Sequence, residues 1–231
     1  MQINVIKSYQ QGHLSRGLTV VIDVFRAFTT ACYVFQNGAQ VVFPVENFNE
    51  AILLKNKLPN SLIIGEVNGH KINEADYGNS PAEIEHTSFL GKKVIITTSA
   101  GTKGLIRAAL AKEIITGSFV NAMAVKDYIV GKNPRVVTLL CTDNRWEDNE
   151  DALFAEYLKG LLEKRPRNFT LIKKHLANHQ CSDRFLRHHS TNLLKRDFQL
   201  AMKLNSFNFI LKAETKNKIL MLNQIDNFSG H

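Results

Sequence analysis

Two polar loops of the chain carry residue types that bind phosphate, and each follows a short apolar segment. The apolar residues 18–22 lead into Asp23 and then Arg26, and residues 94–96 lead into a loop of hydroxyl residues and glycine at 97–102. An arginine can form a bidentate pair with a phosphate or carboxylate, and N–H groups at a helix start attract anions. Each loop alone is equally well explained by helix capping. Together they predict a phosphate-binding site.

The second loop would hold a phosphoryl group through hydroxyls and backbone N–H groups. The residues expected to touch the substrate are Thr98, Ser99, Gly101 and Thr102. An apolar pattern with helical spacing resumes at Leu105, so this loop lies at a predicted helix start. In the first loop, Asp23 comes at the carboxyl end of a predicted parallel strand, where open α/β sheets bind ligands.

Carboxylates after two further apolar segments indicate a metal site. Glu66 follows the apolar residues 63–64, and a group of four acidic residues follows the strand predicted at 136–140 and opens the next predicted helix. These four are Glu147, Asp148, Glu150 and Asp151. The helix dipole favours acidic residues in a first turn, but a group this dense exceeds what capping requires. Such oxygen ligands suit Mg²⁺, which binds through one or two carboxylates, water and substrate phosphate.

Several common phosphate and nucleotide signatures are absent from the sequence. A phosphatase of the haloacid dehalogenase type needs a second Asp two residues after the first, where this chain has Phe25. Neither G-x-x-x-x-G-K-[ST] nor a strand-borne G-x-G-x-x-G occurs. The residues from Cys181 to Arg187 have the C-x5-R spacing of a thiol phosphatase, but they contain no glycine and no apolar strand precedes them. We interpret that spacing as a coincidence.

Histidines near Cys181 resemble part of a zinc site. His175 and His179 share one face of a predicted helix, and His188 and His189 follow. No second paired spacing accompanies them, so the sequence favours surface histidines in a basic segment.

A set of motifs in a fixed order resembles the 2-phosphosulfolactate phosphatase family, the ComB-like proteins of coenzyme M biosynthesis. The motifs are residues 21–30 (VIDVFRAFTT), 65–69 (GEVNG), 78–81 (GNSP), 97–102 (TTSAGT) and 117–122 (GSFVNA), with the pair Glu150 and Asp151. The ordered set covers residues 18–158 and is far more specific than any one motif. Beyond it, the resemblance is limited to residues 190–201 with Asp197.

The resemblance implies a Mg²⁺-dependent phosphatase that hydrolyses 2-phospho-3-sulfolactate to 3-sulfolactate and phosphate. The implied catalytic residues are Asp23, Arg26, Glu150 and Asp151, and the implied metal ligands are Asp23, Glu66, Glu150 and Asp151. Ser118, Asn121, Asn79 and Ser80 are expected to orient the substrate. The attacking group is either a water molecule or the Asp23 carboxylate.

The chain departs from the family pattern in the second loop, where Ala100 stands in place of an Asn. Because of this change, two alternatives stay open. The substrate could be another phosphorylated hydroxy acid, or the chain could be a non-catalytic protein that binds anions or nucleic acid. The net charge of +8 is concentrated in residues 159–231, with fourteen Lys and Arg against five Asp and Glu. No nucleic-acid motif occurs and the charges are not interleaved with aromatic residues. The electrostatic field of these basic residues is therefore better explained by attraction of a small anionic phosphoester.

Alternating apolar strands and helices predict an α/β fold of three layers, α/β/α, with a mostly parallel or mixed sheet. The order strand, polar loop, helix, strand, helix occurs from residue 18 and again from residue 94, which leaves open a division into two similar lobes. Right-handed crossovers would bring the carboxyl ends of the strands to one edge. Those ends carry Asp23, Glu66, Thr98 and Cys141. Residues 207–211 and 219–222 predict a closing hairpin.

Length and composition predict one domain over residues 1–231, in which the basic segment 159–231 completes the fold. The 231 residues are 44% hydrophobic, enough for a substantial core. No apolar segment has the length of a membrane span, and no signal peptide opens the chain. Cys32, Cys141 and Cys181 are few and scattered, as in a reducing cytoplasm. We expect a cytoplasmic enzyme without membrane contact, and assembly into a homo-oligomer remains open.

Overall fold

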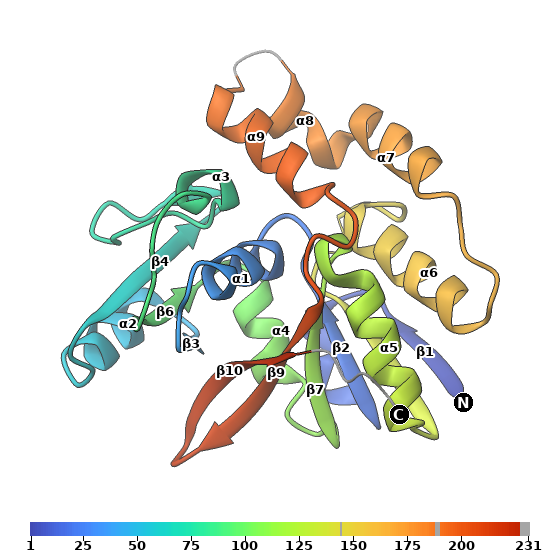
Figure 1. Cartoon of the computed structure of the whole chain (residues 1–231), viewed down its shortest axis with the longest axis horizontal. Coiled ribbons are helices and arrows are strands. Elements are labelled where there is room, and N and C mark those ends of the chain that lie inside the picture. The colour runs from blue at the N-terminus through green and yellow to red at the C-terminus, as the bar shows by residue number, and fades with distance from the viewer. Residues whose placement is uncertain (144, 188–189, 227–231) are drawn as a thin grey trace.

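The computed structural model describes residues 1–143, 145–187 and 190–226, and Figure 1 shows how they are arranged. Within these residues the fold is α/β, with one mixed sheet of ten strands. The strands are β1 (Gln2–Ile6), β2 (Leu18–Ile22), β3 (Val41–Pro44), β4 (Ser61–Val67), β5 (His70–Lys71), β6 (Lys93–Thr97), β7 (Glu113–Gly117), β8 (Val136–Cys141), β9 (Phe209–Lys216) and β10 (Ile219–Asp226). The α-helices are α1 (Ala27–Gln36), α2 (Phe48–Lys55), α3 (Pro81–Ile84), α4 (Gly101–Arg107), α5 (Ala122–Lys132), α6 (Glu150–Leu162), α7 (Phe169–Asn178), α8 (Asp183–Leu186) and α9 (Asn192–Ala201). The short 3-10 helices are η1 (Tyr9–Leu14), η2 (Phe119–Asn121) and η3 (Gln180–Ser182).

The sheet contains two groups of parallel strands with an antiparallel hairpin between them. The strand order is β1-β8-β2-β7-β9-β10-β3-β6-β4-β5. Strands β1, β8, β2 and β7 pair in parallel, and so do β3, β6 and β4. The hairpin β9–β10 pairs antiparallel with β7 on one side and with β3 on the other. The predicted hairpin is therefore confirmed, and it lies in the middle of the sheet.

The predicted repeat is present in the order of elements but does not divide the molecule into two lobes. The chain runs β2, α1, β3, α2 in the first unit and β6, α4, β7, α5 in the second. In each unit the two strands lie in different parallel groups. Each unit therefore crosses the central hairpin, and the two groups of strands are connected repeatedly by the chain.

Side chains of the central strand β2 alternate between two helical layers. Leu18, Val20 and Ile22 pack in a buried cluster with residues of α5, α6 and α7. Val21 packs in a second cluster, with residues of α1 and α4. A strand that is buried on both faces is a continuous apolar run in the sequence, which is why β2 was predictable. The packing confirms the three-layer α/β/α architecture.

The C-terminal helices cover the first polar loop. Figure 1 shows α7, α8 and α9, in orange, together at one end of the molecule. Phe25 of the loop packs against Phe185 of α8 and Phe198 of α9, with ring centroids 5.1 and 5.7 Å apart. Arg196 of α9 pairs with Glu85 at 2.6 Å. Part of the positive charge of the basic segment 159–231 is therefore neutralised within the fold.

The start of α6 differs from the sequence prediction. The helix begins at Glu150 because the side chain of Asn149 accepts a hydrogen bond from the N–H of Ala152 at 2.9 Å. Glu147 and Asp148, which were predicted to open the helix, lie before it. The sequence prediction also missed the edge strand β1, whose residues are exposed or only half-buried and give a weak apolar signal.

The cysteines are structural. Cys32, Cys141 and Cys181 are buried free thiols. Cys181 lies in the 3-10 helix η3, directly before α8, and burial raises the pKa of its thiol. These features confirm that the C-x5-R spacing is a coincidence. The described residues form no helix with the length and apolar character needed to cross a membrane.

Candidate active site

A cleft of about 360 Å³ lies where the carboxyl ends of β2, β4, β6 and β8 come together. One residue at or just after each of these ends lines it, in chain order Asp23, Glu66, Ser99 and Thr142. The predicted convergence of the strand ends is therefore confirmed, although the central hairpin separates the two groups of strands. The other charged and amide side chains of the cleft are Gln10, Arg26, Asn68, Asn79, Asp143, Arg145, Glu150, Asp151 and Arg184.

Asp23 is a buried carboxylate held at the start of the first polar loop. Its Oδ1 accepts a hydrogen bond from the N–H of Ala27 at 2.9 Å. The absence of a side chain at Gly101 makes room for the other oxygen, because a Cβ there would lie 2.7 Å from Oδ2. Burial, reinforced by the carboxylates of Glu66 and Asp143, raises the pKa of Asp23 to about 6. The groups of the chain around Asp23 thus only partly stabilise the negative charge of its ionised carboxylate.

Glu150 is a second buried carboxylate of the cleft and is the first residue of α6. Burial, together with the nearby Asp143 and Asp23, raises its pKa to about 7. Its Oε2 has no hydrogen-bond partner among the described residues. A buried oxygen without a partner is costly, so the chain leaves the hydrogen-bonding capacity of this carboxyl group incompletely used.

Asp151 lines the same cleft, but both of its oxygens are occupied by the chain. Oδ1 accepts a hydrogen bond from the N–H of Val24 at 2.9 Å. Oδ2 accepts from the N–H of Thr142 at 3.0 Å, from the Thr142 hydroxyl and from the N–H of Asp143. These bonds join the loop after β2 to the loop after β8. Of the two adjacent carboxylates predicted as ligands, Glu150 is the one with an open oxygen.

Glu66 joins the two strand ends on the other side of the cleft. Its Oε1 accepts hydrogen bonds from the N–H of Gly69 and from the Ser99 hydroxyl, the latter at 3.0 Å. Ser99 in turn accepts a hydrogen bond from the N–H of Asn68 at 2.9 Å. The structure thus brings together two residues predicted from separate motifs.

Arg26 is fixed by a buried carboxylate from the C-terminal part of the chain. Its Nη1 donates to Oδ2 of Asp197 at 2.5 Å, and its Nη2 donates to the carbonyl oxygen of Gly69 at 3.0 Å. Arg26 is 5% exposed and Asp197 is fully buried. The Nε–H of Arg26 has no acceptor among the described residues, so one donor remains for a ligand in the cleft.

Asn79 and Ser80, both predicted to orient the substrate, have different environments. Asn79 lines the cleft, and its buried Oδ1 has no partner within the described part of the chain. The Ser80 hydroxyl donates to Oδ1 of Asp197 at 2.7 Å. Ser80 therefore acts on the cleft indirectly, by holding the carboxylate that fixes Arg26.

Two further arginines line the cleft. Arg145 pairs with Asp143, with its Nε 2.9 Å from Oδ2, so its charge is largely balanced. Arg184 of α8 donates from Nη2 to the carbonyl oxygen of Phe25 at 3.3 Å and lies over the ring of Phe185. No carboxylate within the described ranges forms an ion pair with Arg184.

Part of the second polar loop faces inward. Ser99 and Ala100 line the cleft, but Thr98 and Thr102 do not. The N–H of Thr102 donates to the Thr98 hydroxyl at 3.3 Å, and the Thr102 hydroxyl donates to the Thr98 carbonyl oxygen at 3.1 Å. These two side chains stabilise the start of α4, while Gly101 lies against Asp23.

Ser118 and Asn121 do not line the cleft, contrary to the prediction that they orient the substrate. Asn121 accepts a hydrogen bond from the N–H of Ser118 at 3.2 Å, and the two form a capping box at η2. The Ser118 hydroxyl lies 2.7 Å from the Thr29 hydroxyl. A polar pair after a strand has the same sequence signature whether it caps a helix or binds a ligand, and here it caps.

Sequence reasoning missed the contributions of Asp197, Arg184, Arg145 and Asp143 to the cleft. Asp197 lies in the segment whose resemblance to the family is weak. Arg184 lies between Cys181 and Arg187, whose C-x5-R spacing we interpreted as a coincidence. Asp197 is buried and Arg184 is exposed, but both belong to charged helices, where spacing alone does not show which side chain reaches a cleft. Arg145 and Asp143 follow β8, the position at which the other functional strand ends were recognised.

The fold and the cleft together define a class of protein, an α/β protein with a cleft of buried carboxylates and of arginines at the carboxyl ends of its strands. A family model described as 2-phosphosulpholactate phosphatase matches residues 4–216. The chain belongs to the 2-phosphosulfolactate phosphatase family, and the predicted resemblance is confirmed. The match extends well beyond residue 158 and includes Arg184 and Asp197.

Relatives with the name probable 2-phosphosulfolactate phosphatase are similar to this chain. The one from Carboxydothermus hydrogenoformans is 39% identical over 146 residues, which are 63% of this chain and 60% of the relative. The one from Caldicellulosiruptor saccharolyticus is 34% identical over 177 residues, 74% of this chain and 73% of the relative. The one from Bacillus subtilis is 30% identical over 165 residues, 71% of this chain and 72% of the relative. The match thus spans less than two thirds of the length of the first relative and more than two thirds of the length of the other two.

The contact between Gly101 and Asp23 gives a first testable prediction. In Gly101→Ala the new Cβ would lie 2.6 Å from the Cβ of Ala27 and 2.7 Å from Asp23 Oδ2, so Asp23 must shift. We expect a loss of about 1–3 kcal/mol in the free energy of unfolding and a roughly 100-fold loss of any activity of the cleft. Chemical denaturation and turnover measure the two effects.

Gly131→Ala is the matched control for this substitution. Gly131 lies within α5, and a Cβ there would meet nothing within 4 Å. Helix propensity predicts a gain of about 0.5–1 kcal/mol in the free energy of unfolding with unchanged activity. Equal behaviour of the two variants would show that Gly101 does not position Asp23.

The raised pKa of Glu150 predicts how stability depends on pH. The folded state holds a proton on Glu150 up to pH about 7, whereas an unfolded glutamate releases it near pH 4.3. The folded state therefore binds more protons between these values, and stability without added cations falls as the pH rises through this window. In Glu150→Gln we expect the fall in melting temperature to be smaller.

Glu147→Gln is the control for the pH experiment, because Glu147 is exposed and lies just before the same helix. Its pH profile should match that of the wild type. Identical profiles for the wild type and Glu150→Gln would contradict the burial of an uncompensated carboxyl group at this position.

Proposed function

We propose that this chain is a Mg²⁺-dependent phosphatase that hydrolyses 2-phospho-3-sulfolactate to 3-sulfolactate and phosphate. Family membership supports phosphatase chemistry, and the relatives' names support this substrate. We also propose a cytoplasmic location, in keeping with the free thiols.

One observation supports a ligand site in the cleft above all others. Three residues that line it each have a buried polar atom without a partner within the described residues. These atoms are Nε of Arg26, Oδ1 of Asn79 and Oε2 of Glu150. A positive donor, a neutral acceptor and a carboxylate oxygen around one cavity suit a phosphoester together with a cation. Buried polar groups normally have partners, so a bound substrate would supply what the chain omits.

The donor set fits Mg²⁺. Asp23 and Glu150 are oxygen ligands whose raised pKa values would fall when a cation binds. In the described part of the chain, no three carboxylates of the cleft bring ligand atoms within 4.8 Å of one another. A cation there would complete its shell with water and substrate oxygens, as Mg²⁺ commonly does. When bound, Mg²⁺ would neutralise the charge of the phosphoryl group and favour its attack by water.

The side chains of the cleft would have different roles in binding the phosphoryl group and the cation. Arg26, immobilised by Asp197, would donate from its free Nε–H to a phosphoryl oxygen as negative charge develops. Asp23 and Glu150 would hold the cation, with Glu66 placing Ser99 beside it. Asn79 would accept a hydrogen bond from the substrate. Because Asp151 is occupied by four donors, we assign it the role of fixing the two loops.

Arg184 is the residue best placed to recognise the second anionic group of the substrate. It lines the cleft, no ion pair within the described residues balances its charge, and its Nη1 lies close to Gly69. A sulfonate or carboxylate would pair with this guanidinium in a bidentate geometry.

Turnover tests the proposed function. Phosphate release should be measured on a panel of small phosphoesters that includes 2-phospho-3-sulfolactate and phosphorylated hydroxy acids without a sulfonate. We expect turnover of the sulfonated substrate with Mg²⁺, loss of activity with EDTA, and a decrease of at least about 100-fold in Asp23→Asn. A correctly folded Asp23→Asn with full Mg²⁺-dependent activity would contradict the assignment.

Arg184→Gln tests recognition of the second anion. Loss of a charge-assisted hydrogen bond should raise KM roughly tenfold or more with little change in kcat, because in this assignment Arg184 binds the second anion and not the transferred phosphate. The penalty should be smaller for substrates that lack the second anion. Arg187→Gln is the matched control, since Arg187 pairs with Asp183 at 2.5 Å and does not line the cleft. Equal effects of the two variants would argue against a specific role for Arg184.

A further inference from the structure

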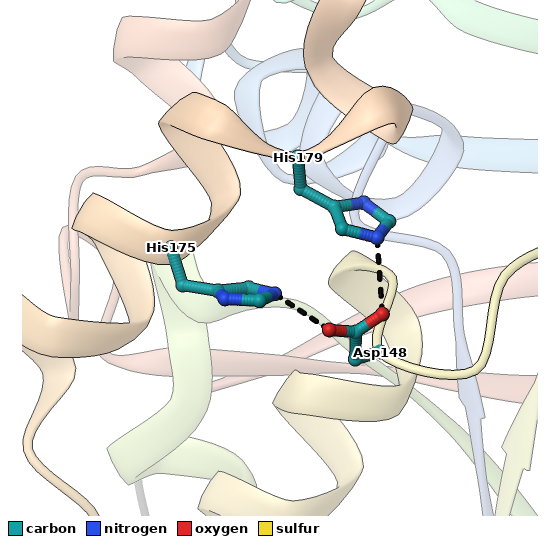
Figure 2. A group of neighbouring side chains, drawn as sticks. All are labelled: Asp148, His175 and His179. Carbon is teal, nitrogen blue, oxygen red and sulfur yellow. Dashed lines mark ion pairs between the residues drawn. The ribbon is translucent and has the colours of Figure 1, made fainter.

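The histidines that the sequence left as surface residues have a third partner in the structure. Asp148 lies between His175 of α7 and His179, the residue that follows α7. Its Oδ2 is 2.8 Å from Nε2 of His175, and its Oδ1 is 3.0 Å from Nε2 of His179. Figure 2 shows the carboxylate with an imidazole ring directed at each of its oxygens. Neither the sequence spacing nor the family motifs join these three residues.

We propose that Asp148, His175 and His179 form a binding site for a transition-metal ion of the Zn²⁺ class, separate from the cleft. Their ligand atoms all lie within 4.8 Å of one another, so a small movement would place three ligands around one ion. Two imidazoles and one carboxylate suit Zn²⁺, Co²⁺ or Ni²⁺, whereas Mg²⁺ prefers oxygen ligands alone. None of the three residues lines the cleft.

The site is both accessible and partly preformed. The side chains of His175 and Asp148 are 45% and 52% exposed, so an ion can enter from solvent, while His179 is only 14% exposed. The two imidazole rings stack with centroids 5.4 Å apart. His179 also packs edge-on against Trp146, with ring centroids 6.0 Å apart. His179 is therefore held by its neighbours, whereas His175 and Asp148 face solvent. Water can occupy the remaining coordination positions of the ion.

Metal binding would have a defined local consequence. The N–H of Cys181 donates to Nδ1 of His179 at 3.2 Å, so the neutral ring carries its proton on Nε2, facing Asp148. An ion on Nε2 takes the place of that proton, and the ring then carries its proton on Nδ1. The Cys181 amide loses its acceptor at the start of η3 as a result. We therefore expect faster hydrogen exchange of this amide in the metal-bound protein.

The chain contains its own spectroscopic probe for this site. Trp146 is its single tryptophan, and it contacts His179 directly. Titration of the full, untagged chain with Co²⁺, in Mg²⁺ excess to occupy the cleft, should quench the fluorescence of Trp146 and give the visible absorption of coordinated Co²⁺. Calorimetry with Zn²⁺ should give one equivalent bound.

Variants separate a specific site from weak surface binding. Loss of even an outer partner of a metal ligand typically costs about 10- to 100-fold in affinity. We therefore expect at least a tenfold loss in His175→Gln, His179→Gln and Asp148→Asn. His86→Gln is the matched control, because His86 is 92% exposed and faces a single carboxylate, Glu85, at 3.9 Å. This variant should bind as the wild type does.

Two results would overturn the proposal. One is a wild type that binds no Zn²⁺ or Co²⁺ under these conditions, with no change at Trp146. The other is equal affinity in the wild type and in the double variant His175→Gln, His179→Gln, which would place the ion elsewhere. Thermal unfolding of each variant without metal checks that it is folded. Phosphatase activity does not enter the test, so its outcome is independent of the proposed function.

Discussion

The cleft depends on the hydrogen bonds that Asp151 accepts from two loops. Four donors, three of them backbone N–H groups, converge on this carboxylate and tie the chain after β2 to the chain after β8. Because all four hydrogen bonds converge on one side chain, they hold two irregular segments in one geometry. That geometry sets the position of Asp23 on one side and of Asp143 with Arg145 on the other.

A second constraint is electrostatic. Burial raises the pKa of both Asp23 and Glu150, and the Asp23 carboxylate adds to the rise at Glu150, so the folded chain favours protons or a cation at these groups. Arg26 lines the same cleft, but its positive charge pairs with Asp197. Since Asp197 and Arg184 come from the C-terminal helices, the cleft is incomplete without a segment far away in sequence. Both residues lie within the part of the chain that the family model matches.

The sequence predicted the elements that have a strong local signal in the chain. Strand β2 is buried on both faces and β9–β10 is joined at Asn217 and Lys218, whose positive φ values of 51° and 64° suit a two-residue turn. Residues whose role depends on a distant partner were not predictable in the same way. Ser118 has the signature of a ligand-binding residue but caps a helix. Asp148 has the signature of a helix start but faces His175 of α7 and His179, which follows α7.

The most direct test of the account is a crystal structure of the protein grown with Mn²⁺, in place of Mg²⁺, and inorganic phosphate, with anomalous scattering used to locate the metal. We expect the ion between Asp23 and Glu150, and a phosphate oxygen within hydrogen-bond distance of Arg26 Nε. An ion and a phosphate bound only outside this cleft would contradict the central claim that its buried carboxylates and arginine form the phosphatase site.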